Sequence, residues 1–327
     1  MACGPNAGSG QFVRWDVSDW VVLSVEKRGS TPSTWLQDPG DPDVRWLHKD
    51  TMIPANSREQ GEDWSEVLST QVALALGVPV APVRLCTRKG RRGSLSCNIR
   101  PEAADLNEGW VALEECPQVD GYFPHREGEP GVDPGRPRVK RPGHTIANVQ
   151  RALAGVAAPP GFEGPAQMNG FDVFAGYLLL DALIANRDRH EENWAVLRPR
   201  LTGRVDQLAP TYDHASSLGY NLLDAKRERC LNDQEALKAW VLRGTAYRFE
   251  HETVPATLVD LASEALAACS TVARNYWQSR LVDLDLSVVH GALETRAIPE
   301  MSEVTCKFAR AVLDHNFWRL RDAIARA

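Results

Sequence analysis

The sequence has 327 residues, of which 43% are apolar and 24% are charged, so the chain can bury a core and lacks the composition of a disordered protein. This length suits two lobes or two modest domains better than one small core. The formal net charge is −6, and no run of Lys and Arg is long enough to attract nucleic acid, so we expect no nucleic-acid partner. The basic stretch 88–92 is typical of a solvated hairpin turn, and a polyanion contact there is the less favoured alternative.

The cysteines and the apolar runs indicate in which cellular compartment the protein is expected. None of the seven cysteines lies within four residues of another, which excludes a CxxC zinc or redox motif. Their odd number argues against a disulfide framework, so we expect reduced thiols. Residues 1–10 lack the basic start and apolar run of a signal peptide, and no stretch reaches the ~18 apolar residues of a membrane span. We therefore expect a cytoplasmic protein with no membrane partner.

Residues 20–99 are predicted to be β-rich with one helix. Apolar, β-branched runs indicate strands, and a broad apolar stripe at helical spacing, ended by Gly77, indicates a helix. Segments rich in Gly, Pro, Asp and Ser separate them as loops and turns. The expected order is strand 20–25, loop 27–34, turn 37–42, strand 44–49, helix 63–76, strand 80–86 and strand 94–99.

Beyond residue 100 the pattern becomes helical. Residues 101–110 are predicted to be a connector, and the Pro-, Gly- and charge-rich residues 116–143 a long flexible loop that is either disordered or substrate-facing. The change of pattern places the lobe boundary at residue 105, giving segments 1–105 and 106–327. The expected helices are 145–153, 171–184, 233–242, 258–268, 271–281 and 303–324, with a short strand at 195–197.

The densest polar signal is the run from Asn186 to Asn193, which lies between two apolar segments. An ordinary polar loop would explain one Asp or one His, but it does not explain the set Asn186, Asp188, His190 and Asn193. In phosphoryl transfer one carboxylate orients the attacking hydroxyl and accepts its proton, and an Asn a few residues later helps to hold Mg²⁺. Asp188 and Asn193 have the spacing of that pair.

A second carboxylate lies in the segment 210–219, at Asp213. A kinase needs such a carboxylate, after the catalytic loop, for the metal ion that bridges the phosphates. A surface turn built from Asp, Ser and Gly would look the same. Asp213 therefore supports a kinase function only together with Asp188 and Asn193.

Lys49, at the end of a predicted strand, and Glu66, in the next predicted helix, form a third signal. Kinases use a strand Lys on the nucleotide phosphates and a helix Glu that pairs with it. Each residue alone is most simply a solvated charge, and Glu66 could instead complement the helix dipole. The pair lies upstream of the two Asp motifs, which is the order that the mechanism requires.

The loop from Gly29 to Thr34 is in the position of a phosphate-covering loop. It is neither a G-x-G-x-x-G nor a Walker A motif, although its backbone amides and hydroxyls could cradle phosphate. Gly29, Ser30 and Thr31 are candidate nucleotide contacts, and the four hydroxyl residues of the loop are candidate phosphorylation sites. A simple strand connection is an equal alternative.

The pattern Asn186-x-Asp188-x-His190-x-x-Asn193, followed by Tyr212-Asp213-x-x-Ser216, resembles the HipA-like kinase family, including its phosphatidylinositol-kinase-like relatives. The resemblance extends in order over roughly residues 20–325. It implies an α+β, bilobed protein-kinase-like fold and transfer of phosphate from ATP with Mg²⁺, usually to a protein Ser or Thr. By motif position Asp188 would be the base, Asn193 and Asp213 metal ligands, Lys49 and Glu66 the ATP clamp, and His190 a loop-orienting residue of the catalytic set.

The sequence departs from this family in two places. The toxin members carry a separate N-terminal subdomain, for which the residues before Lys49 are too few, and their phosphate loop is richer in Ser and Gly than residues 29–32. Three other functions stay open beside a protein kinase. They are a small-molecule or lipid kinase, a nucleotide-binding pseudokinase, and a metal hydrolase that uses Asp188, His190, Asp213 and His214.

Overall fold

The computed structural model describes residues 12–26, 32–55, 58–124 and 132–325. It is a mixed α+β protein with a sheet-rich N-terminal part and a helical C-terminal part, which confirms the predicted fold class. Among the described residues, no helix is long and apolar enough to cross a membrane. Gly29, Ser30 and Thr31, predicted to cover phosphate, lie outside these residues, whereas Ser33 and Thr34 belong to a strand and not to the predicted loop.

Six strands form the N-terminal sheet in the order β1-β5-β6-β4-β3-β2. The parallel pair is β1 with β5, and the other neighbouring strands are antiparallel. Strand β3 was not predicted because its short sequence lies between two strong turn signals. The strands are β1 Trp15–Asp16, β2 Val22–Glu26, β3 Ser33–Gln37, β4 Arg45–Asp50, β5 Val83–Arg88 and β6 Arg91–Cys97.

A second sheet has the order β7-β8-β9, with β7 Ala104–Glu108, β8 Ala195–Pro199 and β9 Gln207–Leu208. The predicted connector 101–110 is therefore wrong, because β7 pairs along its whole length with β8. Strand β7 also spans residue 105, where the sequence placed the lobe boundary. That division of the chain stays a prediction.

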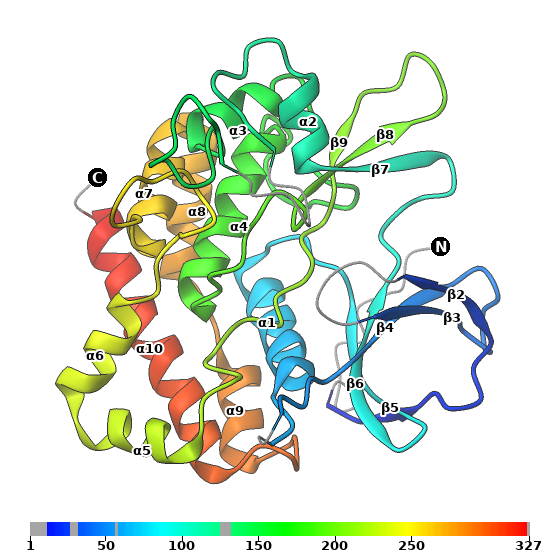
Figure 1. Ribbon diagram of the computed structural model, residues 1–327, viewed down its shortest axis with the longest axis vertical. Coiled ribbons are helices and arrows are strands. Elements are labelled where there is room, and N and C mark those ends of the chain that lie inside the picture. The colour runs from blue at the N-terminus through cyan, green and yellow to red at the C-terminus, as the bar shows by residue number, and fades with distance from the viewer. Residues whose placement is uncertain (1–11, 27–31, 56–57, 125–131, 326–327) are drawn as a thin grey trace.

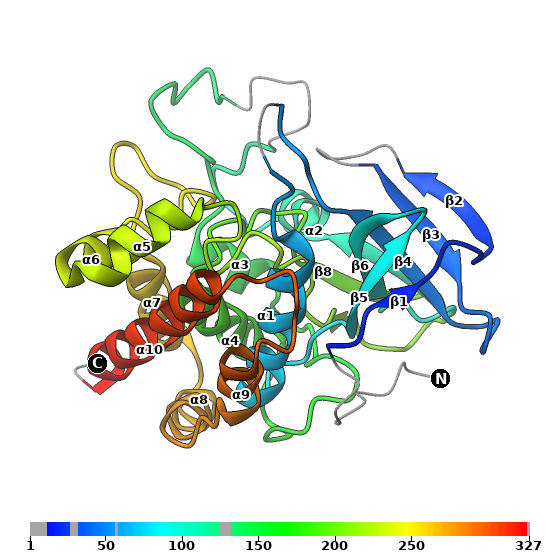
Figure 2. The same ribbon diagram turned by 90° about the horizontal axis from the view of Figure 1, so that it is seen from below.

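Helix α1, Glu62–Leu76, is buried on almost all of its faces because it lies between the six-stranded sheet and the helical part (Figures 1 and 2). Helix α4, Gly170–Ile184, is buried along its full length, as expected for a helix that is apolar all round. Their ends carry the signals expected from sequence. Gly77 ends α1 in the left-handed conformation, with φ 80°, and Asn169 with Asp172 forms a capping box at the start of α4.

Helices α1, α7, α8 and α10 pack against α4. Predicted helices are present near their expected positions, and the described residues also contain α2, α5 and α9, which were not predicted. Helices α2 and α9 are short, and α5 has a strongly polar sequence with little apolar periodicity. The remaining helices are α2 Gly109–Glu115, α3 Ile146–Ala152, α5 Asp224–Asn232, α6 Gln234–Leu242, α7 Leu258–Ala268, α8 Thr271–Val282, α9 Ser287–Thr295 and α10 Glu303–Ala325.

Two smaller expectations need correction. Cys86, Cys116, Cys230, Cys269 and Cys306 are free thiols as expected, but Cys97 is disulfide-bonded. The basic turn 88–92 is not simply solvated, because Arg92 forms ion pairs with Glu59 and Asp63 at the start of α1. A polyanion at Arg92 would have to compete with both pairs.

Candidate active site

The loop 186–194 joins α4 to β8 and carries the densest polar motif. Helix α4 ends at Ala185, which has a positive φ of 55° although it is not glycine. The backbone N–H of Asn186 donates to the carbonyl of Asp181 at 2.8 Å. A non-glycine residue in this conformation is uncommon and is retained where the surroundings require a sharp change of direction. The turn sends the polar run away from the buried helix.

A buried ion pair ties this loop to helix α4. Arg189 Nε donates to Asp181 Oδ2 and Arg189 Nη2 to Asp181 Oδ1, both at 2.8 Å, and the two side chains are only 2% and 1% exposed. The Asn186 amide donates to the same carboxylate at 2.7 Å, and Arg189 also donates to the carbonyl of Asn193. Burial alone would lower the pKa of Arg189, but Asp181 outweighs it and the pKa is raised. Two loop positions are thus tied to one helix residue.

Asp188 lies at the surface of the loop, with its side chain 25% exposed. Its Oδ1 accepts from Arg248 Nε at 2.7 Å and from the Tyr247 hydroxyl at 3.3 Å. No hydrogen bond from a described residue reaches its Oδ2. Arg248 and Tyr247 therefore orient the carboxylate through one oxygen and leave the other available to a hydroxyl group.

The side chain of Asn193 is hydrogen-bonded to the backbone of Asp188. Its side-chain Nδ2 donates to the carbonyl oxygen of Asp188 at 2.8 Å. With the nitrogen so engaged, the amide oxygen is the atom that could bind a metal ion. The two residues that the sequence paired by spacing are thus in direct contact.

Asp213 lies in the segment after β9 and also has a positive φ, 60°. Next to it, the Tyr212 hydroxyl donates to the carbonyl of Glu192 in the loop 186–194 at 2.8 Å. Thr211 pairs with the backbone of residues 79–81 that leads into β5, with N–H to O distances of 2.9 Å in both directions. The Asp213 segment is therefore attached both to the loop 186–194 and to the N-terminal part of the chain.

Lys49 and Asp213 form an ion pair, with Nζ and Oδ2 3.0 Å apart, although they are 164 residues apart in sequence. Burial opposes both charges, but each partner outweighs it, so the pKa of Lys49 is raised and that of Asp213 is lowered. Both groups therefore stay charged near neutral pH. This contact brings the predicted nucleotide lysine to the predicted metal carboxylate.

The predicted ion pair between Lys49 and Glu66 does not form among the described residues. Glu66 instead lies with its Oε1 3.5 Å from Nδ1 of His214, and both side chains are buried. Glu66 is still close enough to Lys49 to contribute to its raised pKa. Lys49 thus pairs with Asp213, whereas the sequence predicted Glu66 as its partner.

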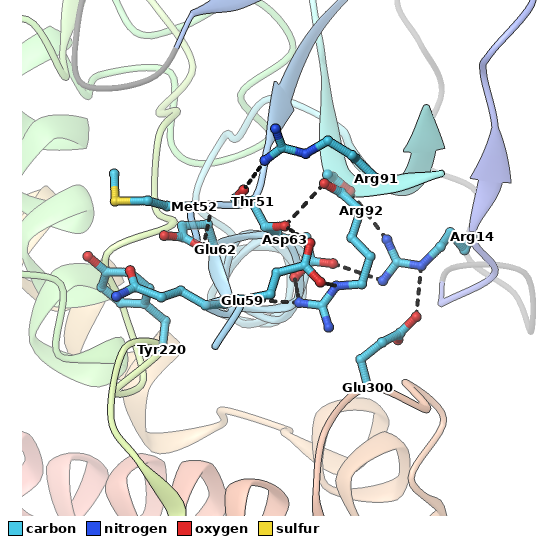
Figure 3. Close-up of polar contacts among 12 residues, drawn as sticks. Arg14, Thr51, Met52, Glu59, Glu62, Asp63, Arg91, Arg92, Tyr220 and Glu300 are labelled. Atoms are coloured by element: carbon cyan, nitrogen blue, oxygen red, sulfur yellow. Dashed lines mark hydrogen bonds and ion pairs between the residues drawn. The ribbon is translucent and has the colours of Figure 1, made fainter. Parts of the chain in front are cut away.

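Helix α1, which carries Glu66, is fixed at both ends. The fully buried carboxylate of Asp63 pairs with Arg14 at 2.8 Å and with Arg92 at 3.3 Å, and Arg14 reaches on to Glu300 (Figure 3). At the other end, Arg280 of α8 donates to the last carbonyls of the helix. These contacts hold α1 against both the sheet and the helical part.

The charges of both candidate carboxylates, Asp188 and Asp213, act on the ring of His190. Its Nδ1 accepts from the backbone N–H of Glu192 at 3.2 Å. Burial lowers the pKa of His190 to about 4, although Asp188 opposes this shift. The ring is therefore neutral at pH 7 and supports the loop as an acceptor.

Lowering the pH from 7 to 5 should destabilise the fold in part through His190. An exposed His in the unfolded chain has a pKa of about 6.5, so below that pH the unfolded chain binds a proton that the native ring does not. The free energy of unfolding then falls by up to about 1.4 kcal/mol per pH unit for this group. Urea unfolding from pH 5 to 8 should give a flatter curve for His190→Asn than for the wild type. Parallel curves for the two proteins would contradict this assignment.

Several residues of the site were not predicted. Arg189 belongs to the loop 186–194, and Tyr247, Arg248 and Arg141 contact or approach it although they lie about 45 to 60 residues from it in sequence. The only available signal was the unusual number of charges beside Asp188, which includes Arg187 and Arg189. As for the metal-hydrolase alternative, the described residues contain no group of three or more His, Cys, Asp or Glu that could hold a metal ion.

Comparison with solved structures gives two informative matches. The first is the proinflammatory kinase CtkA of Helicobacter pylori, with a TM-score of 0.68 and 16% identity over 96% of this chain and 97% of that chain. The second is HipA of Shewanella oneidensis MR-1, from a toxin–antitoxin complex with HipB and operator DNA, with a TM-score of 0.50 and 14% identity over 94% of this chain and 70% of that chain. The chain has the fold of these HipA-like kinases.

No model of a protein family matches the sequence, and no curated protein sequence matches it. The kinase fold is thus established by structure, at an identity too low to carry over an activity. Function must be argued from the site itself.

Proposed function

We propose that this chain is an ATP- and Mg²⁺-dependent kinase that transfers phosphate to a Ser or Thr of a protein, in the cytoplasm. The observation that carries the proposal is the contact between Lys49 and Asp213 at 3.0 Å. It joins the N-terminal sheet to the segment that Tyr212 attaches to the catalytic loop. The shared fold with a solved kinase structure supports the same proposal, but the activity is argued from the residues of the site.

The donor set fits magnesium. Mg²⁺ prefers oxygen ligands and is commonly held by one or two protein groups together with substrate phosphates. Asp213 offers a carboxylate whose lowered pKa keeps it ionised, and Asn193 offers an amide oxygen. When bound, the ion supplies positive charge against the phosphate oxygens.

The remaining chemistry belongs to the residues of this chain. Lys49 would hold phosphate oxygens of the nucleotide, at the position where it now meets Asp213. Asp188, oriented by Arg248 through Oδ1, would accept the proton of the attacking hydroxyl at Oδ2. In that step the acceptor oxygen bonds to the terminal phosphorus, the bond from phosphorus to the ADP oxygen breaks, and the proton moves to Asp188.

Replacing Lys49 with Ala should weaken ATP binding at least tenfold, because the substitution removes the cation that would contact the phosphates. The measurement is the thermal shift produced by ATP with Mg²⁺, together with the KM for ATP in a phosphate-incorporation assay. Lys307→Ala is the matched control, because Lys307 pairs with Glu303 on an exposed helix face. Equal ATP responses in the two variants would overturn the role of Lys49.

A further inference from the structure

Three arginines gather around Asp188 from separate parts of the chain. Arg187 is its neighbour in the catalytic loop, and Arg248 bonds it directly. Both guanidinium groups lie over the ring of Tyr247, at 5.1 Å for Arg187 and 4.9 Å for Arg248. Arg141, from the segment 132–145, is close enough that the charges of Asp188 and Arg248 both act on it. This group is basic in a chain whose net charge is −6.

Arg141 is the most buried of the three, and its guanidinium lacks hydrogen bonds within the described part of the chain. Its side chain is only 13% exposed, and its described partner is Glu191, with Nη1 and Oε2 3.7 Å apart. That distance is too long for a hydrogen bond, and no hydrogen bond joins the Arg141 guanidinium to any other described residue. Burial lowers the pKa of Arg141, Glu191 raises it, and Arg248 lowers it again. A guanidinium with five donors beside a second guanidinium favours an anionic partner.

The segment that carries Arg248 is held in place. His144 Nδ1 bonds the carbonyl of Arg248 at 2.7 Å, and its ring stacks on Phe249 with centroids 4.2 Å apart. The backbones of Lys140 and His251 bond each other in both directions. Burial lowers the pKa of His144, so the ring is neutral and can donate from Nδ1 while Nε2 accepts from the indole of Trp194. Arg141 and Arg248 therefore sit on two segments that are fixed to each other.

We propose that Arg141 and Arg187 bind an acidic side chain of a protein acceptor, next to the Ser or Thr that faces Asp188. The inference rests on the proposed kinase function. Arg248 is committed to Asp188, whereas Arg141 and Arg187 make no hydrogen bond to a described carboxylate. A carboxylate accepts two parallel hydrogen bonds from a guanidinium, which gives direction as well as attraction. Part of the segment predicted to face the substrate thus supplies the specificity.

The test compares three Ser peptides that differ only in the flanking residues, which are Glu, Gln or Lys. Wild-type protein should phosphorylate the Glu peptide with a kcat/KM at least tenfold above that of the Gln peptide, and should use the Lys peptide least. Arg141→Gln should raise the KM for the Glu peptide about tenfold, which removes most of the preference for Glu over Gln, and should leave the KM for ATP unchanged. Arg141→Lys should restore part of the preference. Arg138→Gln is the matched control, because Arg138 is exposed in the same segment.

The outcomes separate the two proposals. If wild-type protein phosphorylates no peptide and no protein, the proposed kinase function fails. If it phosphorylates the Glu and Gln peptides equally well, the kinase function stands and the acidic acceptor is wrong. If Arg141→Gln raises the KM for ATP instead, the arginines hold nucleotide phosphates, and the acceptor proposal is overturned. Transfer to phosphorylated small molecules but not to peptides would overturn it as well.

Discussion

Asp188→Ala should lower phosphate incorporation by about 10²- to 10⁴-fold, which is the usual contribution of a positioned general base. The reason is geometric. Arg248 and Tyr247 both bond Oδ1 of Asp188. Its Oδ2 accepts no hydrogen bond from a described residue and is the oxygen that we assign to the acceptor hydroxyl. Binding of ATP should persist, because Lys49, Asn193 and Asp213 are unchanged. The assay is transfer of labelled phosphate from ATP, with the thermal shift by ATP measured in parallel.

Two further variants keep this experiment decisive. Asp188→Asn preserves the shape of the side chain and its contact with Arg248 but removes the basic oxygen, so it should lose activity to a similar extent while melting near the wild-type temperature. Asp206→Ala is the control for losing a carboxylate that pairs with an arginine, since Asp206 bonds Arg198 at 3.3 Å on the second sheet. Wild-type activity in both Asp188 variants, with Asp206→Ala also unchanged, would remove Asp188 from the mechanism.

The fold was largely predictable because its main elements have strong local signals. Helix α4 is apolar all round and carries a capping box, and α1 ends at a glycine with positive φ. The elements that were missed have weak local signals and depend on distant partners. Strand β7 has the sequence Ala-Asp-Leu-Asn-Glu, which does not favour a strand by itself and becomes one by pairing with β8, about 90 residues later.

In the candidate site, too, features with a local sequence signal were predicted and contacts between distant residues were not. Asp188, Asn193 and Asp213 could be predicted as site residues because the spacing within each motif is a local property of the sequence. The partners of these residues could not, since Lys49 lies 164 residues from Asp213 and Arg248 lies 60 residues from Asp188. Charge alone could not choose Asp213 rather than Glu66 as the partner of Lys49, because both carboxylates are acceptable and only the packing of α1 decides.

Asp181→Ala should cost about 3–5 kcal/mol of folding free energy, because it leaves the buried Arg189 without a counter-charge. The two side chains are 1% and 2% exposed and are joined by two hydrogen bonds of 2.8 Å. Asp105→Ala is the matched control. It removes an equally short pair with Arg200, at 2.7 Å, but both of those side chains are more than half exposed and screened by solvent, so the loss of stability should be far smaller. Urea unfolding of both variants checks the difference, and similar losses would refute the argument.

A double variant separates the stabilising role of this pair from its positioning role. Replacing Asp181 with Leu and Arg189 with Met removes both charges together, and buried pairs exchanged for apolar residues of similar size often keep or gain stability. The double variant should therefore recover most of the stability lost in Asp181→Ala. It should stay poorly active, because Asn186 loses its acceptor and the carbonyl of Asn193 loses its donor. Recovery of full phosphate transfer together with stability would show that the pair only fills the core, and that Asp188 and Asn193 are held by other contacts.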